Sequence, residues 1–395
     1  MERVLLVNKF YYPRGGDCTA MLTTEELLKA HGHAVAVFSM QYPDNLPSPW
    51  AGYFAPEVSF SSTRMADRIR AAVRLFHSSG TATRFARLLD DFRPDVVHLH
   101  NIHSYLSPVV AEVARRRGVR IVWTMHDYKL ICPSYSCLRD GQPCELCFTD
   151  RRQVFVHRCM KNSRAASLLA WMEASRWNRR RLERLTDRFI SPSHFLKAKM
   201  VAAGFREEGI EVLHNFMYRP TPPPAPKGDY YCYAGRLSEE KGVATLLEAA
   251  RRLPYPLKII GSGPLHDVLR RRYPQAHVEF TGQLPADVLL PVVQRARFLV
   301  MPSIWYENNP YSVIEALCMG TPVLGANTGG IPELIEAGRN GELFQPGDVE
   351  GLRETVIAAF ARYDTAYPFG GIAAAAQNKF GSEAFYKQLM RIYDH

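Results

Sequence analysis

Two glutamates stand eight positions apart around a segment that carries the signals of a helix start. Asn309 is a good N-cap, Pro310 suits the first helical position, and Gly320 suits the C-terminal stop. This pattern predicts a helix that begins at Pro310, with Glu307 in the loop before it and Glu315 more than one turn inside it. Amides at a helix start attract phosphate, and carboxylates accept hydrogen bonds from diols. The segment therefore indicates a site that binds phosphate and sugar hydroxyls.

Each glutamate also has an ordinary explanation, because acidic residues are common near helix starts. Alone, Glu307 is more often an exposed residue beside a cap, and Glu315 a helix-surface residue. A predicted strand, Phe298–Met301, precedes the pair and favours a functional role, because ligands of open α/β sheets bind at the carboxyl ends of the strands. The functional interpretation of the pair is therefore the stronger one.

A second group of residues offers positive charge after another strand. Gly235 allows close backbone approach, and Arg236 and Lys241 can clamp a diphosphate and stabilise the charge on a leaving group. A polar turn with solvated side chains explains this segment slightly better when it is taken alone. The turn with Gly261 and Gly263 is a weaker signal, because tight turning by itself explains two glycines.

The elements that must position these residues alternate along the chain. Apolar runs and helix-like stretches give a βαβ rhythm in both halves, which predicts parallel sheets covered by helices. A proline-rich stretch at 216–228 can be neither helix nor central strand and is expected to link two domains. We expect an N-terminal domain at 1–215, with a cysteine-rich insertion at about 130–160, and a second domain at 229–380. A C-terminal helix at 381–395 is expected to pack back towards the N-terminal domain.

Length and composition limit the class of protein. The 395 residues exceed one ordinary core, and 47% hydrophobic with 22% charged residues is normal for a soluble globular protein. The chain has no apolar run of about 18 residues, and its start is too quickly polar for a signal peptide, so we expect a cytoplasmic protein. The net charge of +10 fits nucleic acid, an anionic membrane surface or a phosphorylated substrate, and composition does not choose among them.

The order of the motifs is more specific than any one of them. Gly-Arg…Lys-Gly at 235–242 and Gly-Ser-Gly-Pro at 261–264 precede the two glutamates, and Thr-Gly-Gly-Ile-Pro-Glu at 328–333 follows them. This order strongly resembles glycosyltransferase family 4, closely over 230–344 and more loosely over nearly the whole chain. The resemblance implies a retaining enzyme with the GT-B architecture, an α/β fold of two Rossmann-like domains facing across a cleft.

The resemblance also implies a role for each matched residue. Arg236 and Lys241 hold the diphosphate of a nucleotide-sugar donor, Glu307 faces the transferred sugar, and Glu315 binds the ribose hydroxyls. The other donor-binding residues that it implies are Gly15, Gly16, Gly235, Gly261, Gly263, Asn309, Pro310, Tyr311 and Ser312. It implies catalysis without a divalent metal, in which the leaving phosphate helps to take the acceptor proton.

Histidines stand at the ends of two predicted strands of the first half. His126 ends an apolar strand and is followed by an aspartate, which favours a functional role more than a lone histidine does. The resemblance implies that His126 contacts the donor sugar. His98 and His100 share one face of the preceding strand, which packing explains as readily as substrate binding. Gly15 and Gly16 form a turn after the first strand, and without the resemblance this turn has only a structural role.

Five cysteines fall in one short segment that is rich in turn residues, and in a reducing compartment such a cluster indicates metal rather than disulfides. Cys144 and Cys147 form a C-x2-C pair, and Cys132 and Cys159 flank it. These four thiolates can close a tetrahedral structural zinc site that leaves Cys137 over. Free thiols are the alternative interpretation.

The stretch 163–187 combines apolar residues with arginines, as a basic amphipathic helix does. A core-packed helix with a solvated basic face is an equally good interpretation. Because many members of the family act on lipid-linked acceptors, the resemblance favours peripheral contact with an anionic inner-membrane surface.

With these observations, the resemblance implies a hexosyl-type retaining glycosyltransferase that moves a sugar from a nucleotide-diphosphate sugar to a glycan or lipid-linked acceptor. We expect a role in cell-surface polysaccharide or lipopolysaccharide biosynthesis. A GT-B sugar-nucleotide epimerase is one alternative. A zinc-bearing nucleic-acid-binding protein is the alternative from another class, but it leaves the ordered motifs unexplained, so we expect no nucleic-acid partner.

Overall fold

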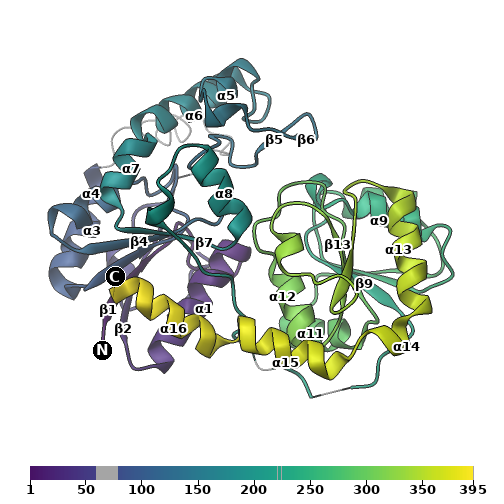
Figure 1. Cartoon of the computed structure of the whole chain (residues 1–395). Helices are drawn as coiled ribbons and strands as arrows, with labels where there is room; N and C mark the ends of the chain where they lie inside the picture. The colour runs from purple at the N-terminus through teal and green to yellow at the C-terminus, as the bar shows by residue number, and fades with distance from the viewer. Residues whose placement is uncertain (59–78, 220, 224, 395) are drawn as a thin grey trace. The chain divides into compact units, whose positions relative to one another are not determined.

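The structure is a computed structural model of the chain and describes residues 1–58, 79–219, 221–223 and 225–394. The chain forms two compact units (Figure 1). The first holds Met1–Arg139, Cys144–Leu213 and Tyr386–His395, and the second holds Asp140–Pro143 and His214–Phe385. Pro220 and Pro224, in the stretch expected to link the domains, lie outside the described residues.

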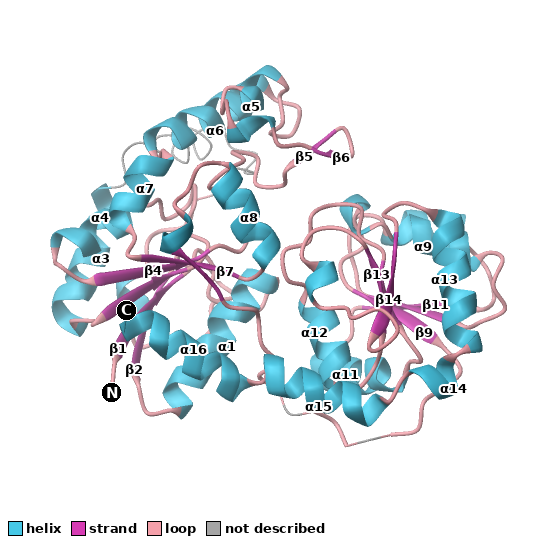
Figure 2. Ribbon diagram, in the orientation of Figure 1, coloured by secondary structure: helices cyan, strands magenta, loops and turns pink. Residues whose placement is uncertain are grey.

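The first unit is built on a six-stranded parallel sheet with the strand order β2-β1-β3-β4-β7-β8. Its strands are β1 (Arg3–Val7), β2 (Ala34–Phe38), β3 (Val96–Leu99), β4 (Arg120–Thr124), β7 (Arg188–Ser191) and β8 (Ile210–Val212). Its helices are α1 (Gly16–Ala30), α3 (Ser79–Phe92), α4 (Val109–Arg116), α5 (Gln153–Val156), α6 (Arg164–Arg176), α7 (Arg179–Leu185) and α8 (His194–Ala202). Helices cover both faces of the sheet (Figure 2), which explains why the central strands are continuous apolar runs.

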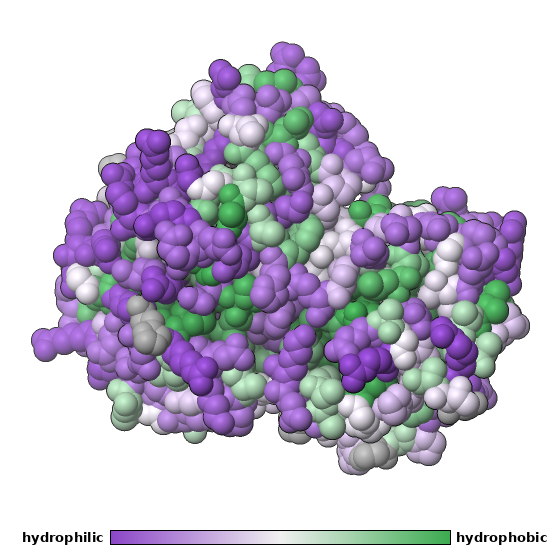
Figure 3. Space-filling view, in the orientation of Figure 1, coloured by the Kyte–Doolittle hydropathy of each residue, from purple (hydrophilic) through white to green (hydrophobic). Residues whose placement is uncertain are grey.

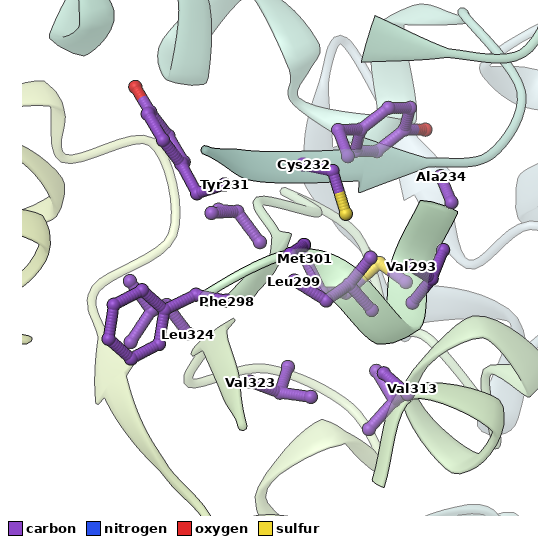
Figure 4. Packing of buried hydrophobic residues seen from close by; sticks show 14 of the residues in the cluster. Tyr231, Cys232, Ala234, Val293, Phe298, Leu299, Met301, Val313, Val323 and Leu324 are labelled. Atoms are coloured by element: carbon purple, nitrogen blue, oxygen red, sulfur yellow. The ribbon is translucent and has the colours of Figure 1, made fainter. Parts of the chain in front are cut away.

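The second unit repeats this design with the strand order β11-β10-β9-β12-β13-β14, again all parallel. Its strands are β9 (Tyr231–Ala234), β10 (Leu257–Ile260), β11 (Val278–Gly282), β12 (Leu299–Met301), β13 (Val323–Ala326) and β14 (Gly341–Phe344). Its helices are α9 (Val243–Ala250), α10 (His266–Arg272), α11 (Ala286–Arg295), α12 (Tyr311–Cys318), α13 (Val349–Ala361), α14 (Tyr363–Ala366) and α15 (Phe369–Phe380). Side chains of β9, β12 and β13 pack with α11 and α12 in one buried cluster (Figure 4).

The last helix, α16 (Ser382–Asp394), brings the end of the chain to the first unit. Tyr393 Oη lies 2.7 Å from His98 Nδ1, and Tyr386 Oη lies 2.7 Å from His33 Nε2. The guanidinium of Arg120 also donates a hydrogen bond to the carbonyl of Ile392 at 3.1 Å. Polar contacts therefore attach α16 to the first sheet.

The structure confirms the α/β class, with two parallel sheets, and the strand expected at Phe298–Met301 is β12, which begins one residue later. In the two six-stranded sheets the sequence reasoning missed β8 and β14, which are both edge strands. Each is short and carries a glutamate, so the apolar run that identified the central strands is absent there. Helix α15 was also missed, because two adjacent glycines near its start weaken its helix propensity.

The expectation of one amphipathic helix in the basic stretch at 163–187 is wrong. The stretch forms two helices, α6 and α7, whose N-caps Ser163 and Asn178 each accept a hydrogen bond from a first-turn amide. Trp177, at the break, is buried, and the guanidinium of Arg181 lies 4.4 Å from its ring centroid. Asn178 is a strong helix N-cap, so it starts a new helix rather than continuing the first one. In the described part of the chain, no helix is long and apolar enough to cross a membrane.

Candidate active site

The second unit places two charged residues where its strand order reverses. The chain runs from β9 outwards to β10 and β11 and then returns to β12 on the other side of β9. The loops after β9 and β12 therefore diverge at one point of the sheet, where ligands of open α/β folds bind. Lys241 comes from the first loop and Glu307 from the second, and Lys241 Nζ donates a hydrogen bond to Glu307 Oε1 at 2.6 Å.

Glu307 is 5% exposed, and its carboxylate is held by more than one donor. The hydroxyl of Ser303 donates a hydrogen bond to Oε1 at 2.6 Å, in addition to the one from Lys241. Burial raises the pKa of Glu307, but the Lys241 ammonium and these hydrogen bonds outweigh burial and lower the pKa below its ordinary value. Glu307 is therefore an ionised carboxylate with a fixed orientation.

Two glycines allow the loops around this pair to come close together. Gly242 has φ 66° and Gly329 has φ 60°, both in the left-handed region that favours glycine. A Cβ at Gly242 would lie 1.9 Å from the carbonyl oxygen of Pro302, and one at Gly329 would lie 2.2 Å from that of Glu307. The amide after Gly329 donates a hydrogen bond to the same Glu307 carbonyl at 2.7 Å. The Thr-Gly-Gly turn thus holds the backbone of Glu307.

Three other glycines lie where the loops after β9 and β10 touch. A Cβ at Gly261 would lie 1.9 Å from the carbonyl oxygen of Gly235, and one at Gly263 would lie 2.4 Å from that of Leu237. Loop packing therefore already requires Gly261 and Gly263. Arg236, next to Gly235, is exposed.

The helix after β12 begins differently from the expectation. Its N-cap is Pro310 and its first residue is Tyr311, so the assignment of Asn309 as the N-cap is wrong. Asn309 is 5% exposed, and its side-chain Oδ1 accepts a hydrogen bond from the Asn215 amide at 2.8 Å. The Asn215 side chain in turn donates to the Asn309 carbonyl at 2.8 Å. A tertiary contact thus occupies the side chain that would otherwise cap, and it holds the segment before Tyr311 and Ser312.

Glu315 lies on α12, one turn beyond its start, and is partly buried. Burial raises the pKa of its carboxyl to about 7, and the charge of Arg219 opposes this only in part. In the described part of the chain, no side chain donates a hydrogen bond to this carboxylate. Glu315 is therefore a desolvated acceptor that a ligand with hydroxyl groups could satisfy.

The first unit gathers polar side chains at its own reversal of strand order, between β1 and β3. The side chain of Asn8, after β1, accepts a hydrogen bond from the Asn101 amide at 3.1 Å. The Asn101 side chain donates to Asp17 at 3.2 Å and to Asp127 at 3.4 Å. Asp17 lies in the first turn of α1, whose N-cap is Gly15 and whose first residue is Gly16. The Asn101 side-chain amide thus joins a carboxylate of α1 to one in the loop after β4.

His126 lies at the same edge and contacts another histidine. Its Nε2 lies 2.9 Å from His100 Nδ1, and the two rings are nearly parallel, with an interplanar angle of 12°. Burial lowers the pKa of His126 to about 4, although the charge of Asp17 opposes this. At neutral pH the imidazole of His126 is therefore uncharged.

Aromatic rings stand beside this polar cluster. The centroid of Phe10 lies 5.6 Å from that of Tyr12, 5.2 Å from that of Tyr42 and 5.9 Å from that of Tyr105. The guanidinium of Arg14 lies over Phe10, 4.1 Å from its centroid. Aromatic faces next to a few polar groups are a common lining of small-molecule sites.

All eight cysteines are free thiols. Hydrogen bonds with the thiols of Cys137 and then Cys147 lower the pKa of Cys132, despite burial. Cys147 packs with Cys159 in a small apolar cluster, and the Cys144 amide donates to the Cys137 carbonyl at 2.7 Å. The structure thus places Cys137, which the sequence reasoning left over, against Cys132.

Sequence reasoning missed several residues that hold this site together. Ser303 and Asn215 orient Glu307 and Asn309, and Asn8 and Asn101 join the loops of the first unit. Asn8 and Asn101 carried a signal, since each is a polar residue just beyond a buried strand. Asn215 carried none, because it meets Asn309 across 94 positions of sequence.

Two α/β units, each with a six-stranded parallel sheet, are the architecture of the GT-B fold. Solved structures of this class match the whole chain. HepE from Anabaena, solved in complex with UDP, superimposes with a TM-score of 0.68 and 18% identity, covering 100% of both chains. The galactosyltransferase WaaB of the lipopolysaccharide outer core superimposes with a TM-score of 0.64 and 17% identity, covering 98% of both chains. At these identities the likeness shows the fold.

The family follows from the sequence matches. Residues 19–217 match the model of Glycosyltransferase Family 4, and residues 228–362 match that of Glycosyl transferases group 1. The chain belongs to glycosyltransferase family 4 and is a glycosyltransferase.

Curated relatives agree with this assignment. A Klebsiella pneumoniae protein, described as an uncharacterized 42.6 kDa protein in cps region, is 25% identical over 353 residues, covering 84% of this chain and 87% of that protein. The putative colanic acid biosynthesis glycosyltransferase WcaL of Escherichia coli K12 is 31% identical over 171 residues, covering 40% of this chain and 41% of that protein.

Proposed function

We propose that the chain transfers a hexosyl group from a nucleotide-diphosphate sugar, with retention of anomeric configuration, to a glycan or lipid-linked acceptor. The observation that carries the proposal is the Lys241–Glu307 pair at the reversal of strand order, next to the start of α12. It combines a cation for phosphate with an ionised carboxylate for the sugar. Relatives named for colanic acid biosynthesis, and one in a cps region, support a role in cell-surface polysaccharide biosynthesis.

The donor nucleotide would bind through Glu315. A ribose diol offers two O–H donors to a carboxylate that has no protein donor in the described part of the chain. The Anabaena protein HepE has been solved with UDP and with UDP-glucose. This supports uridine nucleotides as the first donors to test.

The chemistry would rest on stabilising the leaving group. As the bond between the sugar and the diphosphate breaks, negative charge grows on the phosphate, and Arg236, Lys241 and the first-turn amides of α12 would stabilise it. Glu307 would face the sugar and stabilise positive charge at the anomeric carbon. The leaving phosphate would take the proton of the acceptor hydroxyl, so the mechanism needs neither a protein base nor a divalent metal.

The acceptor would bind at the first unit. Its sheet edge combines the Asp17–Asn101–Asp127 hydrogen-bond cluster with the rings around Phe10. Carboxylates and amides match sugar hydroxyls, and aromatic faces cover apolar sugar faces, which supports a glycan acceptor.

The experiment that tests the donor site is thermal unfolding of the purified chain with UDP, GDP, UDP-glucose and GDP-mannose. A nucleotide that binds the native state raises the melting temperature with its concentration. We expect stabilisation by one nucleotide family and a loss of about 10–100-fold in affinity in Glu315→Gln, which removes charge-assisted hydrogen bonds. Glu248→Gln, on the exposed face of α9, is the matched control. No stabilisation by any nucleotide would contradict the proposal.

We also propose that α5 and α6 contact an anionic membrane surface. Four of the large hydrophobic residues that are exposed in the described part of the chain lie on these two helices: Phe155, Val156, Leu168 and Met172. Exposed cations lie among them: Arg152, Arg158, Lys161, Arg164 and Arg176. Figure 3 shows hydrophobic residues among hydrophilic ones over α5 and α6. Exposed apolar groups surrounded by cations suit the surface of an anionic bilayer.

Cosedimentation with vesicles tests this contact. We expect binding to phosphatidylglycerol vesicles, little binding to phosphatidylcholine vesicles, and weaker binding of Val156→Glu. Val288→Glu, at an exposed valine of the second unit, is the matched control and should bind as the wild type does. Equal binding of both variants, or no binding to either vesicle, would contradict the contact.

We propose in addition that the cysteine-rich segment holds a structural zinc. Thiolates suit zinc, and the ligands would come from Cys132, Cys144, Cys147 and Cys159, together with Cys137, which contacts Cys132. The segment has a small apolar cluster of its own, so a metal would contribute much of its stability. Metal analysis should find stoichiometric zinc that falls in Cys147→Ser and remains in Cys318→Ser, at a buried thiol of α12. Protein free of zinc would contradict the site.

A further inference from the structure

A line of buried side chains in the first unit leads from α16 to His126. Tyr393 Oη lies 2.7 Å from His98 Nδ1, and His98 Nε2 lies 2.7 Å from Thr124 Oγ1. The ring of His98 stacks on that of His100, with centroids 4.3 Å apart. His100 Nδ1 then lies 2.9 Å from His126 Nε2. His126 thus ends a fixed series of contacts.

His100 is an uncharged residue in this series. It is 2% exposed, and burial, followed by the neighbouring His98 and His126, lowers its pKa well below the ordinary value. Since the pKa of His126 is lowered as well, both rings are neutral near pH 7. One hydrogen therefore lies between His100 Nδ1 and His126 Nε2.

The other nitrogen of His100 indicates which ring carries that hydrogen. His100 Nε2 is buried and has no hydrogen-bond partner in the described part of the chain. If His126 were the donor, His100 Nε2 would carry an N–H without a partner. If His100 is the donor, Nε2 keeps only a lone pair. Buried N–H groups without partners are rarer than unsatisfied acceptors, so the second arrangement is favoured.

We propose that His100 is a positioning residue that fixes His126 as the Nδ1–H tautomer. In that state His126 carries its hydrogen on Nδ1 and keeps an uncharged ring of fixed orientation, and the contact of that ring with the donor sugar rests on the proposed function. His98 supports the arrangement, because both of its nitrogens have hydroxyl partners and its ring packs on His100. The C-terminal helix, through Tyr393, thereby helps to set the orientation of a residue at the sugar site.

Two substitutions of His100 separate the hydrogen bond from the packing. His100→Asn keeps an N–H donor near the position of Nδ1, whereas His100→Leu keeps bulk without a donor. With UDP-glucose as the probe and hydrolysis to UDP as the readout, we expect kcat to fall about 10–100-fold in His100→Leu, as for other lost supporting contacts. KM should stay within about twofold, and His100→Asn should recover most of kcat.

The matched control is His103→Phe. His103 lies at the same sheet edge and stacks on Trp123, with centroids 5.3 Å apart. Phenylalanine keeps that stack, so kcat should be unchanged. An equal loss in His103→Phe would overturn the proposal, because any local disturbance would then suffice. Equal loss in His100→Asn and His100→Leu, or none in either, would overturn it too.

Nitrogen NMR of the histidine-labelled full chain gives a readout that does not depend on activity. The His126 ring signals, identified by their loss in His126→Gln, should show hydrogen on Nδ1 and none on Nε2. Hydrogen on Nε2 would overturn the proposal. If the wild type neither binds UDP nor hydrolyses UDP-glucose, the proposed function fails, while the tautomer still tests the role of His100.

Discussion

Replacing Glu315 by glutamine should stabilise the protein without ligand at pH 8 and much less at pH 5. The carboxyl has an ordinary pKa of 4.5 and a pKa of about 7 in the folded chain, mainly because of burial. The folded state therefore prefers the protonated carboxyl, whereas the unfolded chain ionises near the ordinary value. Stability is full below pH 4.5 and is lost as the pH rises to about 7. Glutamine does not ionise and avoids this loss.

The magnitude follows from the two pKa values. At about 1.4 kcal/mol for each pH unit, the interval from 4.5 to about 7 corresponds to a ceiling of about 3 kcal/mol. The side chain retains some solvent contact, so we expect about 1–2 kcal/mol at pH 8. For a unit of this size that corresponds to a rise in melting temperature of roughly 2–8 °C.

The assay is thermal and urea unfolding of the wild type, Glu315→Gln and Glu248→Gln at pH 5 and pH 8. Glu248 pairs with Arg251 on the surface of α9, so its substitution should change stability by less than about 0.5 kcal/mol at either pH. A gain in Glu315→Gln that is equal at both pH values would refute the reasoning, because the carboxylate would then not be desolvated. The same variant should lose affinity for UDP, which would link the instability of the free site to its function.

Three further predictions test the construction of the site. Gly329→Ala should lower the free energy of unfolding by about 2–4 kcal/mol in urea titrations, because its φ is positive and its Cβ would overlap the Glu307 carbonyl, whereas Gly338→Ala, with positive φ but open space, should cost less. Lys241→Met should destabilise the protein by about 2–3 kcal/mol at pH 8, because it leaves the buried Glu307 carboxylate without its cation. Adding Glu307→Gln to the same chain should restore part of the loss. If the double variant shows no rescue, the two residues are not coupled. Asn309→Ala should cost about 1–3 kcal/mol by leaving the partly buried Asn215 amide without an acceptor, and an unchanged urea midpoint would show that this contact is dispensable.

The central strands and most helices were predictable from local sequence. Strands such as β1 and β9 are continuous apolar runs because helices cover both faces of the sheet. Their apolar residue types therefore identify them as buried strands. Gly320, with φ 73°, ends α12 as the sequence indicates, because local backbone geometry requires glycine there. Edge strands β8 and β14 were not predictable in this way, because pairing with a neighbour defines them more than burial does.

The site residues, too, were predictable from sequence only where a local pattern identifies them. Residue types and motif order determined the fold class, the family resemblance and the identity of Glu307, Lys241 and Glu315 as candidates, since these depend on short-range patterns that a sequence preserves. Tertiary structure alone decided that Lys241 and Glu307 bond to each other and that Asn309 binds Asn215 instead of capping α12. It also decided that His100 meets His126, because contacts between distant loops depend on strand order and close packing, and no local pattern records them.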